Sequence, residues 1–210
     1  MDKLIAYRRL PALLLICGCL FLLLPVPPVH GSAAEPQQVV KETVDRILAL
    51  LKDPTLAGEA KKTERKKRIV AIVEKGFDFR EMSRRTLAMN WRFISPAEQD
   101  TFVALFTKLL ENTYLAKIDQ YSNEKILYKD QLVRGHHAVV ESIVIHNGVE
   151  TPLIYRMENS SGQWLVYDVV IEGVSLVSNY RSQFAGVLER EKFSGLISRI
   201  REKVEGKEKK

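Results

Sequence analysis

The segment HAVVESIVIHNGVETPLIYRMENSSGQWLVYDVVIEGVSLVSNYR, residues 137–181, decides the fold. Apolar residues recur at every second position, and the segment is rich in Val, Ile, Tyr and Trp, which favour strands. Asn147-Gly148 and Ser160-Ser161-Gly162 divide it into three runs, and both sequences are typical of hairpin turns. Together with the preceding run Lys125–Val133, they predict a four-stranded antiparallel meander.

Helical patterns lie on both sides of this sheet. A helix is expected from Pro36 to the Asp53-Pro54 stop, and another from the capping sequence that starts at Ser95. After Gly173 the spacing predicts two further helices, ending near Val204. The fold class is therefore α+β: a curved antiparallel four-stranded sheet with helices packed over one face.

The first 34 residues have the layout of a secretory signal. Lys3, Arg8 and Arg9 precede the apolar run Leu10–Pro25, and small residues follow, so cleavage after Gly31 or Ala34 is expected. An uncleaved anchor is the alternative. Both cysteines lie inside the apolar run, so the mature chain has no thiol chemistry and a net charge of +4. Residues 35–205 are predicted to form one domain, and residues 206–210 a solvated tail.

Candidate catalytic groups are sparse. Asp168 and Glu172 lie four residues apart on a predicted strand, roughly 13 Å, whereas paired glycosidase carboxyls lie about 5 to 9.5 Å apart. His136, His137 and His146 lack the convergent spacing of a zinc site, so no metal is expected. No nucleophile elbow, phosphate-binding loop or dinucleotide fingerprint occurs. The chain is predicted not to be an enzyme; an envelope hydrolase using these groups is the alternative.

The basic run KKTERKKR, residues 61–68, has two interpretations. It is either the solvated start of a helix or a docking site for an acidic partner or an anionic bilayer. Nucleic acid is not an expected partner, because the chain carries a secretory signal.

Several predicted strands are apolar on both faces. Strict alternation places Tyr167, Val169 and Ile171 on one face of the last strand, and Val166 and Val170 on the other. A sheet with one wet face alternates more cleanly. Either the sheet is covered on both sides, or an apolar cavity lies between the sheet and the helices and is open to a nonpolar ligand.

The segment WLVYDVVIEGVSLVSNYRSQFAGVLEREKFSGLISRI, residues 164–200, resembles the signature of the MlaC family. Its core is carried by Trp164, Tyr167, Asp168, Glu172, Gly173, Val174 and Ser175. A second, less specific likeness spans residues 77–121. The resemblance implies a periplasmic phospholipid carrier with acyl chains in a deep apolar pocket, and no cofactor. It also implies shuttling between an outer-membrane lipoprotein–porin complex and an inner-membrane ABC transporter with an MCE-domain subunit, in a pathway that maintains lipid asymmetry.

Periodicity, rather than any ligand motif, predicts the residues that line the pocket. We expect the protein to be a monomer, and the alternative function is an envelope binding module for another small hydrophobic ligand or a protein. The expected lipid-binding residues lie on the long helix (Phe102, Leu105, Phe106, Leu109), on three strands (Val140, Val144, Leu153, Tyr155, Val169, Ile171) and on the following helix (Val177, Tyr180, Phe184).

Overall fold

The computed structural model describes residues 35–119 and 124–208. The chain divides into two units, Met1–Ser32 and Ala33–Lys210, and every element below belongs to the second. The predicted signal segment, residues 1–34, and the end of the predicted tail, residues 209–210, lie outside the described residues. The structure therefore does not test the signal or its cleavage site.

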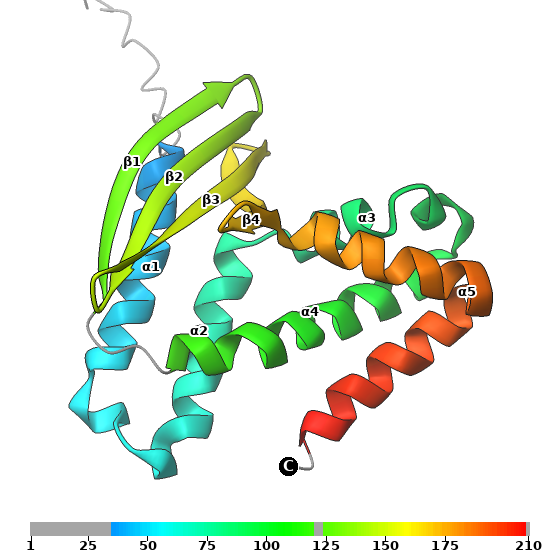
Figure 1. The fold of residues 1–210 in the computed structure, drawn as a ribbon, viewed down its shortest axis with the longest axis horizontal. Coiled ribbons are helices and arrows are strands. Elements are labelled where there is room, and N and C mark those ends of the chain that lie inside the picture. The colour runs from blue at the N-terminus through cyan, green and yellow to red at the C-terminus, as the bar shows by residue number, and fades with distance from the viewer. Residues whose placement is uncertain (1–34, 120–123, 209–210) are drawn as a thin grey trace, which may run out of the picture. The chain divides into compact units, whose positions relative to one another are not determined.

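Helices precede and follow an antiparallel sheet, as predicted (Figure 1). The elements are α1 (Pro36–Lys52), η1 (Pro54–Leu56), η2 (Glu59–Lys61), α2 (Lys62–Gly76), α3 (Phe79–Leu87), η3 (Ala88–Phe93), α4 (Pro96–Asp119), β1 (Lys125–Arg134), β2 (His137–His146), β3 (Val149–Ser160), β4 (Gln163–Ile171), β5 (Val174–Ser175) and α5 (Leu176–Glu208).

The sheet is a meander in which each strand pairs with the next along the chain, in the order β1-β2-β3-β4-β5. The predicted α+β class and antiparallel meander are confirmed, except that the sheet has five strands instead of the predicted four. The short β5 pairs with β4 through Val170–Ser175 and Ile171–Val174. Two residues give too short a pattern to be recognised as a strand in the sequence.

The two predicted hairpin turns are present. Asn147 and Gly148 have φ of 49° and 79°, and Ser161 and Gly162 have φ of 54° and 86°. Two consecutive positive φ values define the type I′ geometry, whose twist matches that of the paired strands. The turns therefore fix the register of β2 on β3 and of β3 on β4.

A bulge in β4 changes which side chains share a face. Arg156 pairs with Asp168, but the next residue of β3, Met157, pairs with Val166, so Tyr167 is an extra residue. The strict alternation expected from the sequence is therefore wrong at this point. Val166 borders the same cavity as Val169 and Ile171, which lie beyond the bulge.

Two apolar clusters form the core. One joins the inner face of the sheet to α1, with Val140 and Met157 fully buried beneath Val40. The other joins α3, α4 and α5 around the aromatic rings of Phe102 and Phe106. On β2, Val139, Ile143 and Ile145 face away from the first cluster and are half-buried, so the two faces of the sheet differ in burial.

Local capping contacts fix the helix starts, and the start of α4 is the one expected at Ser95. The backbone N–H of Ser95 donates to the Glu98 carboxylate (2.8 Å), and the backbone N–H of Glu98 donates to the Ser95 hydroxyl (3.3 Å), which completes a capping box before α4. Asp78 caps α3 by accepting from the backbone N–H of Glu81 (2.8 Å). Lys192, with φ of 61°, interrupts α5, so its two parts correspond to the two helices expected from the sequence.

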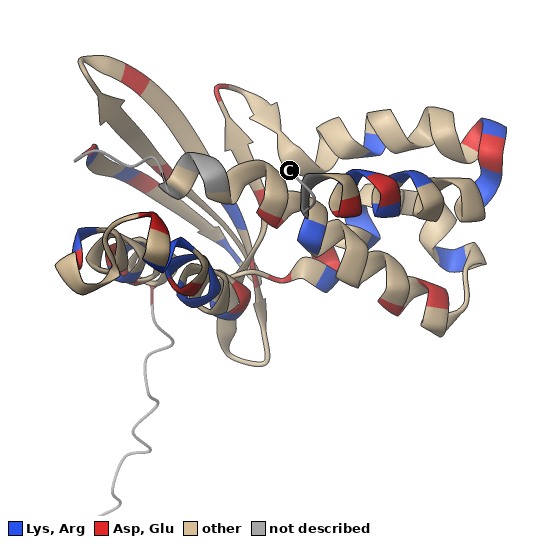
Figure 2. Ribbon diagram, turned by 90° about the horizontal axis from the view of Figure 1, so that it is seen from below, with Lys and Arg blue, Asp and Glu red and all other residues tan. Residues whose placement is uncertain are grey.

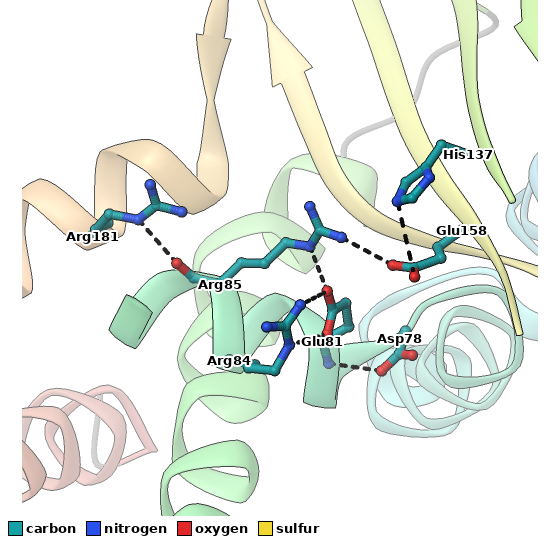
Figure 3. Close-up of polar contacts among 7 residues, drawn as sticks. All are labelled: Asp78, Glu81, Arg84, Arg85, His137, Glu158 and Arg181. Atoms are coloured by element: carbon teal, nitrogen blue, oxygen red, sulfur yellow. Dashed lines mark hydrogen bonds and ion pairs between the residues drawn. The ribbon is translucent and has the colours of Figure 1, made fainter. Parts of the chain in front are cut away.

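A polar cluster fastens α3 to the sheet (Figure 3). Arg85 donates to Glu158 of β3 (2.9 Å) and to Glu81 on its own helix (2.6 Å). Its guanidinium also lies 3.7 Å from the ring centroid of Tyr167, the bulged residue of β4. From α5, Arg181 donates to the backbone carbonyl of Arg85 (2.9 Å). These contacts link α3, β3, β4 and α5 at one corner.

Candidate functional site

An apolar cavity of about 480 Å³ lies between the inner face of the sheet and the helices α1, α2 and α4. This volume falls within the range of about 300–1,000 Å³ that is usual for ligand pockets. The apolar lining residues are Val39, Val40, Val44, Ile47, Leu48 and Leu51 from α1; Val70 and Val73 from α2; Phe77, Phe79 and Met82; Leu110, Tyr114, Leu115 and Ile118 from α4; Ile126, Val144, Leu153, Tyr155, Val166, Val169 and Ile171 from the strands; and Leu176.

Amphipathic helices create the wall opposite the sheet. In α1, Val40, Val44, Ile47, Leu48 and Leu51 recur at the helical period and face one side. Only Val40 of these is buried, and the other four are half-buried. Side chains that line a wall without being fully covered leave apolar surface available to a ligand.

Few polar side chains line the cavity, and most have partners. The Thr43 hydroxyl donates to the carbonyl of Val39 in its own helix (2.8 Å). Glu124 and His146 form a contact of 2.9 Å between the start of β1 and the end of β2. Figure 2 shows that most charged positions of the described chain lie on the helices and few on the strands. The cavity therefore favours a ligand whose buried part is apolar.

Burial affects Glu111 of α4, one of the carboxyl groups that line the cavity. Burial raises its pKa above the ordinary value, and the nearby cations Lys108 and Lys66 offset part of this effect. Its carboxylate lies 3.8 Å from the Lys108 ammonium, and its side chain is 14% exposed.

Two lining tyrosines are also affected by burial. Burial raises the pKa of both Tyr114 and Tyr155. Both phenols therefore remain neutral at physiological pH, and they present polar hydroxyls without a charge. Neither can serve as an ionised base in this environment.

The two carboxylates singled out in the sequence lie at the junction of β4, β5 and α5. Asp168 is 2% exposed, and it accepts hydrogen bonds from Ser175 Oγ (2.7 Å), the Val177 backbone N–H (3.1 Å) and Arg156 (3.1 Å). It thus joins β4 to the first turn of α5. Glu172 has φ of 50° and forms part of the tight turn to β5. Within the described residues, no group of three or more His, Cys, Asp or Glu side chains could hold a metal ion.

The sequence model of the family described as MlaC protein matches residues 41–202. This chain belongs to the MlaC family. In the described ranges, 35–119 and 124–208, no helix is long and apolar enough to cross a membrane.

Relatives of known name agree with this assignment. The chain is 28% identical over 124 residues to the intermembrane phospholipid transport system binding protein MlaC of Haemophilus influenzae, a match that covers 56% of this chain and 58% of that protein. It is 26% identical over 176 residues to the toluene tolerance protein ttg2D of Pseudomonas putida, with 82% of each chain covered.

A solved structure has a similar fold. It is a phospholipid-binding protein from Ralstonia solanacearum in complex with a phospholipid, 29% identical to this chain. The TM-score is 0.73, and the alignment covers 83% of this chain and 99% of the other. The MlaC resemblance expected from residues 164–200 is thus confirmed at the level of family and fold.

The structure divides the thirteen residues predicted to bind lipid into two groups. Val144, Leu153, Tyr155, Val169 and Ile171 line the cavity. Val140 lies in the core beneath α1, and the other seven lie in or against the helical core: Phe102, Leu105, Phe106, Leu109, Val177, Tyr180 and Phe184. Contact of any of these residues with lipid remains a prediction.

Sequence reasoning missed the wall contributed by α1 and α2. Val44, Ile47 and Leu48 recur at the helical period and mark one face of a helix in the sequence, and all three line the cavity together with Val73 of α2. Apolar periodicity shows which face of a helix turns away from water. It does not show whether that face packs against another element or lines a cavity. The continuous apolar stripe along α1 is the signal that the sequence offers for this wall.

Proposed function

We propose that the protein is a periplasmic phospholipid carrier that holds acyl chains in the cavity between α1, α2 and the sheet. The observation that carries this proposal is the cavity of about 480 Å³ with its nearly continuous apolar lining. Membership of the MlaC family and the likeness to a phospholipid-binding protein in complex with a phospholipid support it.

The energetics of an apolar cavity suit a carrier. Each methylene transferred from water contributes about 0.8 kcal/mol. Thirty methylenes would contribute on the order of 20 kcal/mol before the costs of binding are subtracted. Such a ligand leaves the cavity into water very slowly, so transfer requires contact with a protein that offers another apolar path. Binding of this kind depends little on the headgroup, which fits the scarcity of polar lining residues.

The proposal includes a route and a location. The carrier moves phospholipid between an outer-membrane lipoprotein–porin complex and an inner-membrane ABC transporter with an MCE-domain subunit, and this traffic maintains the lipid asymmetry of the outer membrane. The signal layout of residues 1–34 supports a periplasmic location. We further propose that the protein acts as a monomer, without a cofactor and without catalysis.

Lipid extraction from the purified protein tests the proposal. The protein is isolated from the periplasm without detergent, denatured in organic solvent, and its extract is analysed by mass spectrometry. Phospholipid in near-stoichiometric amount is the expected result. A lipid-free protein that also fails to take up labelled phospholipid would refute the proposal, and displacement of phospholipid by an unrelated apolar compound at lower concentration would favour a binding module of another kind.

A further inference from the structure

Two hydroxyl groups on the inner face of the sheet lack hydrogen-bond partners. The hydroxyl oxygens of Tyr128 on β1 and Ser142 on β2 are fully buried, and neither is paired within the described residues. Ser142 as a whole is 2% exposed. A buried hydroxyl in this state has lost its hydrogen bonds to water and gained none from the protein. Such groups are rare in folded proteins, and each calls for a water or a ligand that completes the pairing.

The register of the sheet places these two hydroxyls beside a third. Tyr128 pairs with Ser142 across β1 and β2, so the two side chains leave the same face with Cβ atoms about 4.5–5.5 Å apart. Tyr155 of β3 pairs with Val140, two residues before Ser142, and therefore occupies a diagonal position on that face. Diagonal neighbours lie about 7–8 Å apart, within reach of a tyrosine side chain.

Mutual effects on the pKa agree with this placement. Burial raises the pKa of Tyr155, and the nearby Ser142 hydroxyl offsets part of the rise. Burial also raises the pKa of Tyr128, and Tyr155 adds to that rise. Both phenols therefore stay protonated at physiological pH, and each keeps an O–H group to donate. We call Tyr128, Ser142 and Tyr155 the hydroxyl cluster.

The hydroxyl cluster borders the apolar cavity. Tyr155 lines the cavity itself. Three neighbours of Ser142 on the inner face of the sheet line it too: Ile126, Val144 and Leu153. Helix α1 packs along β1 and β2 on the same side (Figure 1). A ligand in the cavity therefore lies against Tyr155, with the unpaired hydroxyls of Ser142 and Tyr128 next to it.

The charges around the cluster favour an uncharged ligand group. Besides burial and Tyr155, the negative charge of Asp45 on α1 raises the Tyr128 pKa, so Asp45 lies near the cluster. The Asp45 carboxylate pairs with Lys41 at 2.6 Å. A carboxylate or phosphate beside Asp45 would be repelled and would also lose its water. A plain hydrocarbon offers no acceptor, whereas a carbonyl oxygen accepts up to two hydrogen bonds without carrying a charge.

From these observations we infer that the hydroxyl cluster binds the ester carbonyl of an acyl chain held in the cavity. Tyr128 and Ser142 donate to the carbonyl oxygen, and the Tyr155 hydroxyl lies beside it. The ester linkage, rather than the headgroup, is then the polar feature that the protein recognises. Binding there also sets how deep the chain enters, because the carbonyl carbon is the first atom of the chain. The inference rests on the proposed function, since it concerns the same cavity and the same ligand.

Competition between ester-linked and ether-linked phospholipid tests the inference. Vesicles contain equal amounts of diacyl and dialkyl-ether phosphatidylglycerol with the same chain lengths, so the two lipids differ only in the carbonyl oxygens. Delipidated protein is incubated with the vesicles and separated from them, and its bound lipid is extracted and measured by mass spectrometry. The variants are Tyr128→Phe, Ser142→Ala and the double variant. Thr86→Val is the control, because the Thr86 hydroxyl on α3 is also buried without a partner and Thr86 does not line the cavity.

Wild type and Thr86→Val should both bind the ester-linked lipid in about threefold to tenfold excess, the effect of one net hydrogen bond. The double variant should bind the two lipids equally, and each single variant should show a smaller excess than wild type. Tyr128→Phe alone decides the outcome if the double variant does not fold.

The possible failures can be told apart. Uptake of both lipids by wild type without an excess would overturn the inference and leave the carrier function standing. An excess that persists in Tyr128→Phe and in the double variant would overturn it as well. Uptake of neither lipid by wild type would refute the carrier function, and the ester site with it.

Discussion

The Asp168 carboxylate accepts a hydrogen bond from the backbone N–H of Val177 at 3.1 Å, across nine residues of chain. The same carboxylate accepts from the Ser175 hydroxyl at 2.7 Å, and Ser175 Oγ in turn accepts from the backbone N–H of Ser178 at 3.0 Å. An acidic side chain near a helix N-terminus is favoured by the helix dipole and by the unpaired N–H groups there. Asp168 therefore sets the angle at which α5 leaves the sheet.

Replacing Asp168 by Asn should destabilise the fold and leave lipid binding intact. The amide keeps the shape of the carboxylate but loses its charge and one acceptor, so buried donors lose part of their pairing. We expect a loss of about 1–3 kcal/mol in the free energy of unfolding, measured by urea denaturation. Glu172→Gln is the control, since Glu172 is exposed and should change stability by less than about 0.5 kcal/mol. A stable Asp168→Asn protein that has lost a hydrolytic activity of the wild type would contradict this assignment.

Identical substitutions at two leucines should separate the cavity from the core. Leu48 lines the cavity and is half-buried, whereas Leu109 is 1% exposed and lies in the helical core. Leu48→Gln should lower the amount of phospholipid that copurifies while changing stability little. Leu109→Gln should cost about 2–5 kcal/mol, because it places an amide in a packed apolar site. Extracted lipid and urea denaturation of both variants check this prediction, which fails if Leu48→Gln retains full lipid occupancy.

Local signals in the sequence were sufficient to predict the order of the helices and the long strands. Asn147-Gly148 specifies a turn by itself, because both residues tolerate positive φ. Ser95 and Glu98 likewise locate a helix start from four residues of sequence. Capping and turn chemistry act between close neighbours in the chain, so they are present in the sequence before any tertiary structure exists.

The residues that line the cavity were harder to predict from the sequence. Phe102 and Phe106 have the apolar spacing expected of a pocket wall. Their rings instead stack on each other, with centroids 5.5 Å apart, and both pack against Phe184. Ile47 has the same spacing and faces the cavity instead. Whether an apolar face meets another side chain or a gap depends on how elements distant in sequence approach each other. The bulge at Tyr167 adds a one-residue shift that no alternation pattern contains.

Stability should respond to pH in opposite directions at two glutamates of α4. Burial raises the pKa of Glu111 above its ordinary value of 4.5, so the folded state disfavours its charged form. The contribution of Glu111 to stability is fully present below its pKa in the unfolded state, and it is lost as pH rises through its pKa in the folded state. Wild type should therefore lose stability relative to Glu111→Gln between pH 4 and neutral pH. Urea denaturation of delipidated protein across this range gives the difference.

Glu98 is the matched control for this prediction. Hydrogen bonds from the Ser95 backbone N–H and hydroxyl lower the Glu98 pKa below 4.5. Its contribution is present above the unfolded pKa and is lost as pH falls through the folded pKa. Wild type should therefore gain stability relative to Glu98→Gln as pH rises from acidic to neutral. The same pH trend for both variants would contradict the assigned environments.

Arg85 should matter more to stability than its neighbour Arg84. The Arg85 guanidinium is held between Glu81, Glu158 and the Tyr167 ring, and its side chain is 27% exposed. Arg84 is 53% exposed and pairs with Glu81 on the same helix. Pairs this exposed contribute about 0.2–1 kcal/mol. Arg85 adds a link between α3 and the sheet and a cation–π contact of about 0.5–2 kcal/mol.

We therefore expect Arg85→Ala to cost about 1–3 kcal/mol in the free energy of unfolding, and Arg84→Ala less than about 1 kcal/mol. Arg85→Lys should recover only part of the loss. The planar guanidinium pairs with two carboxylates and also covers the Tyr167 ring, whereas a compact ammonium cannot do both. Urea denaturation of the three variants measures these differences. Equal losses for Arg85→Ala and Arg84→Ala would mean that the contacts of Arg85 with Glu158 and Tyr167 add nothing, and α3 would then be held to the sheet by apolar packing alone.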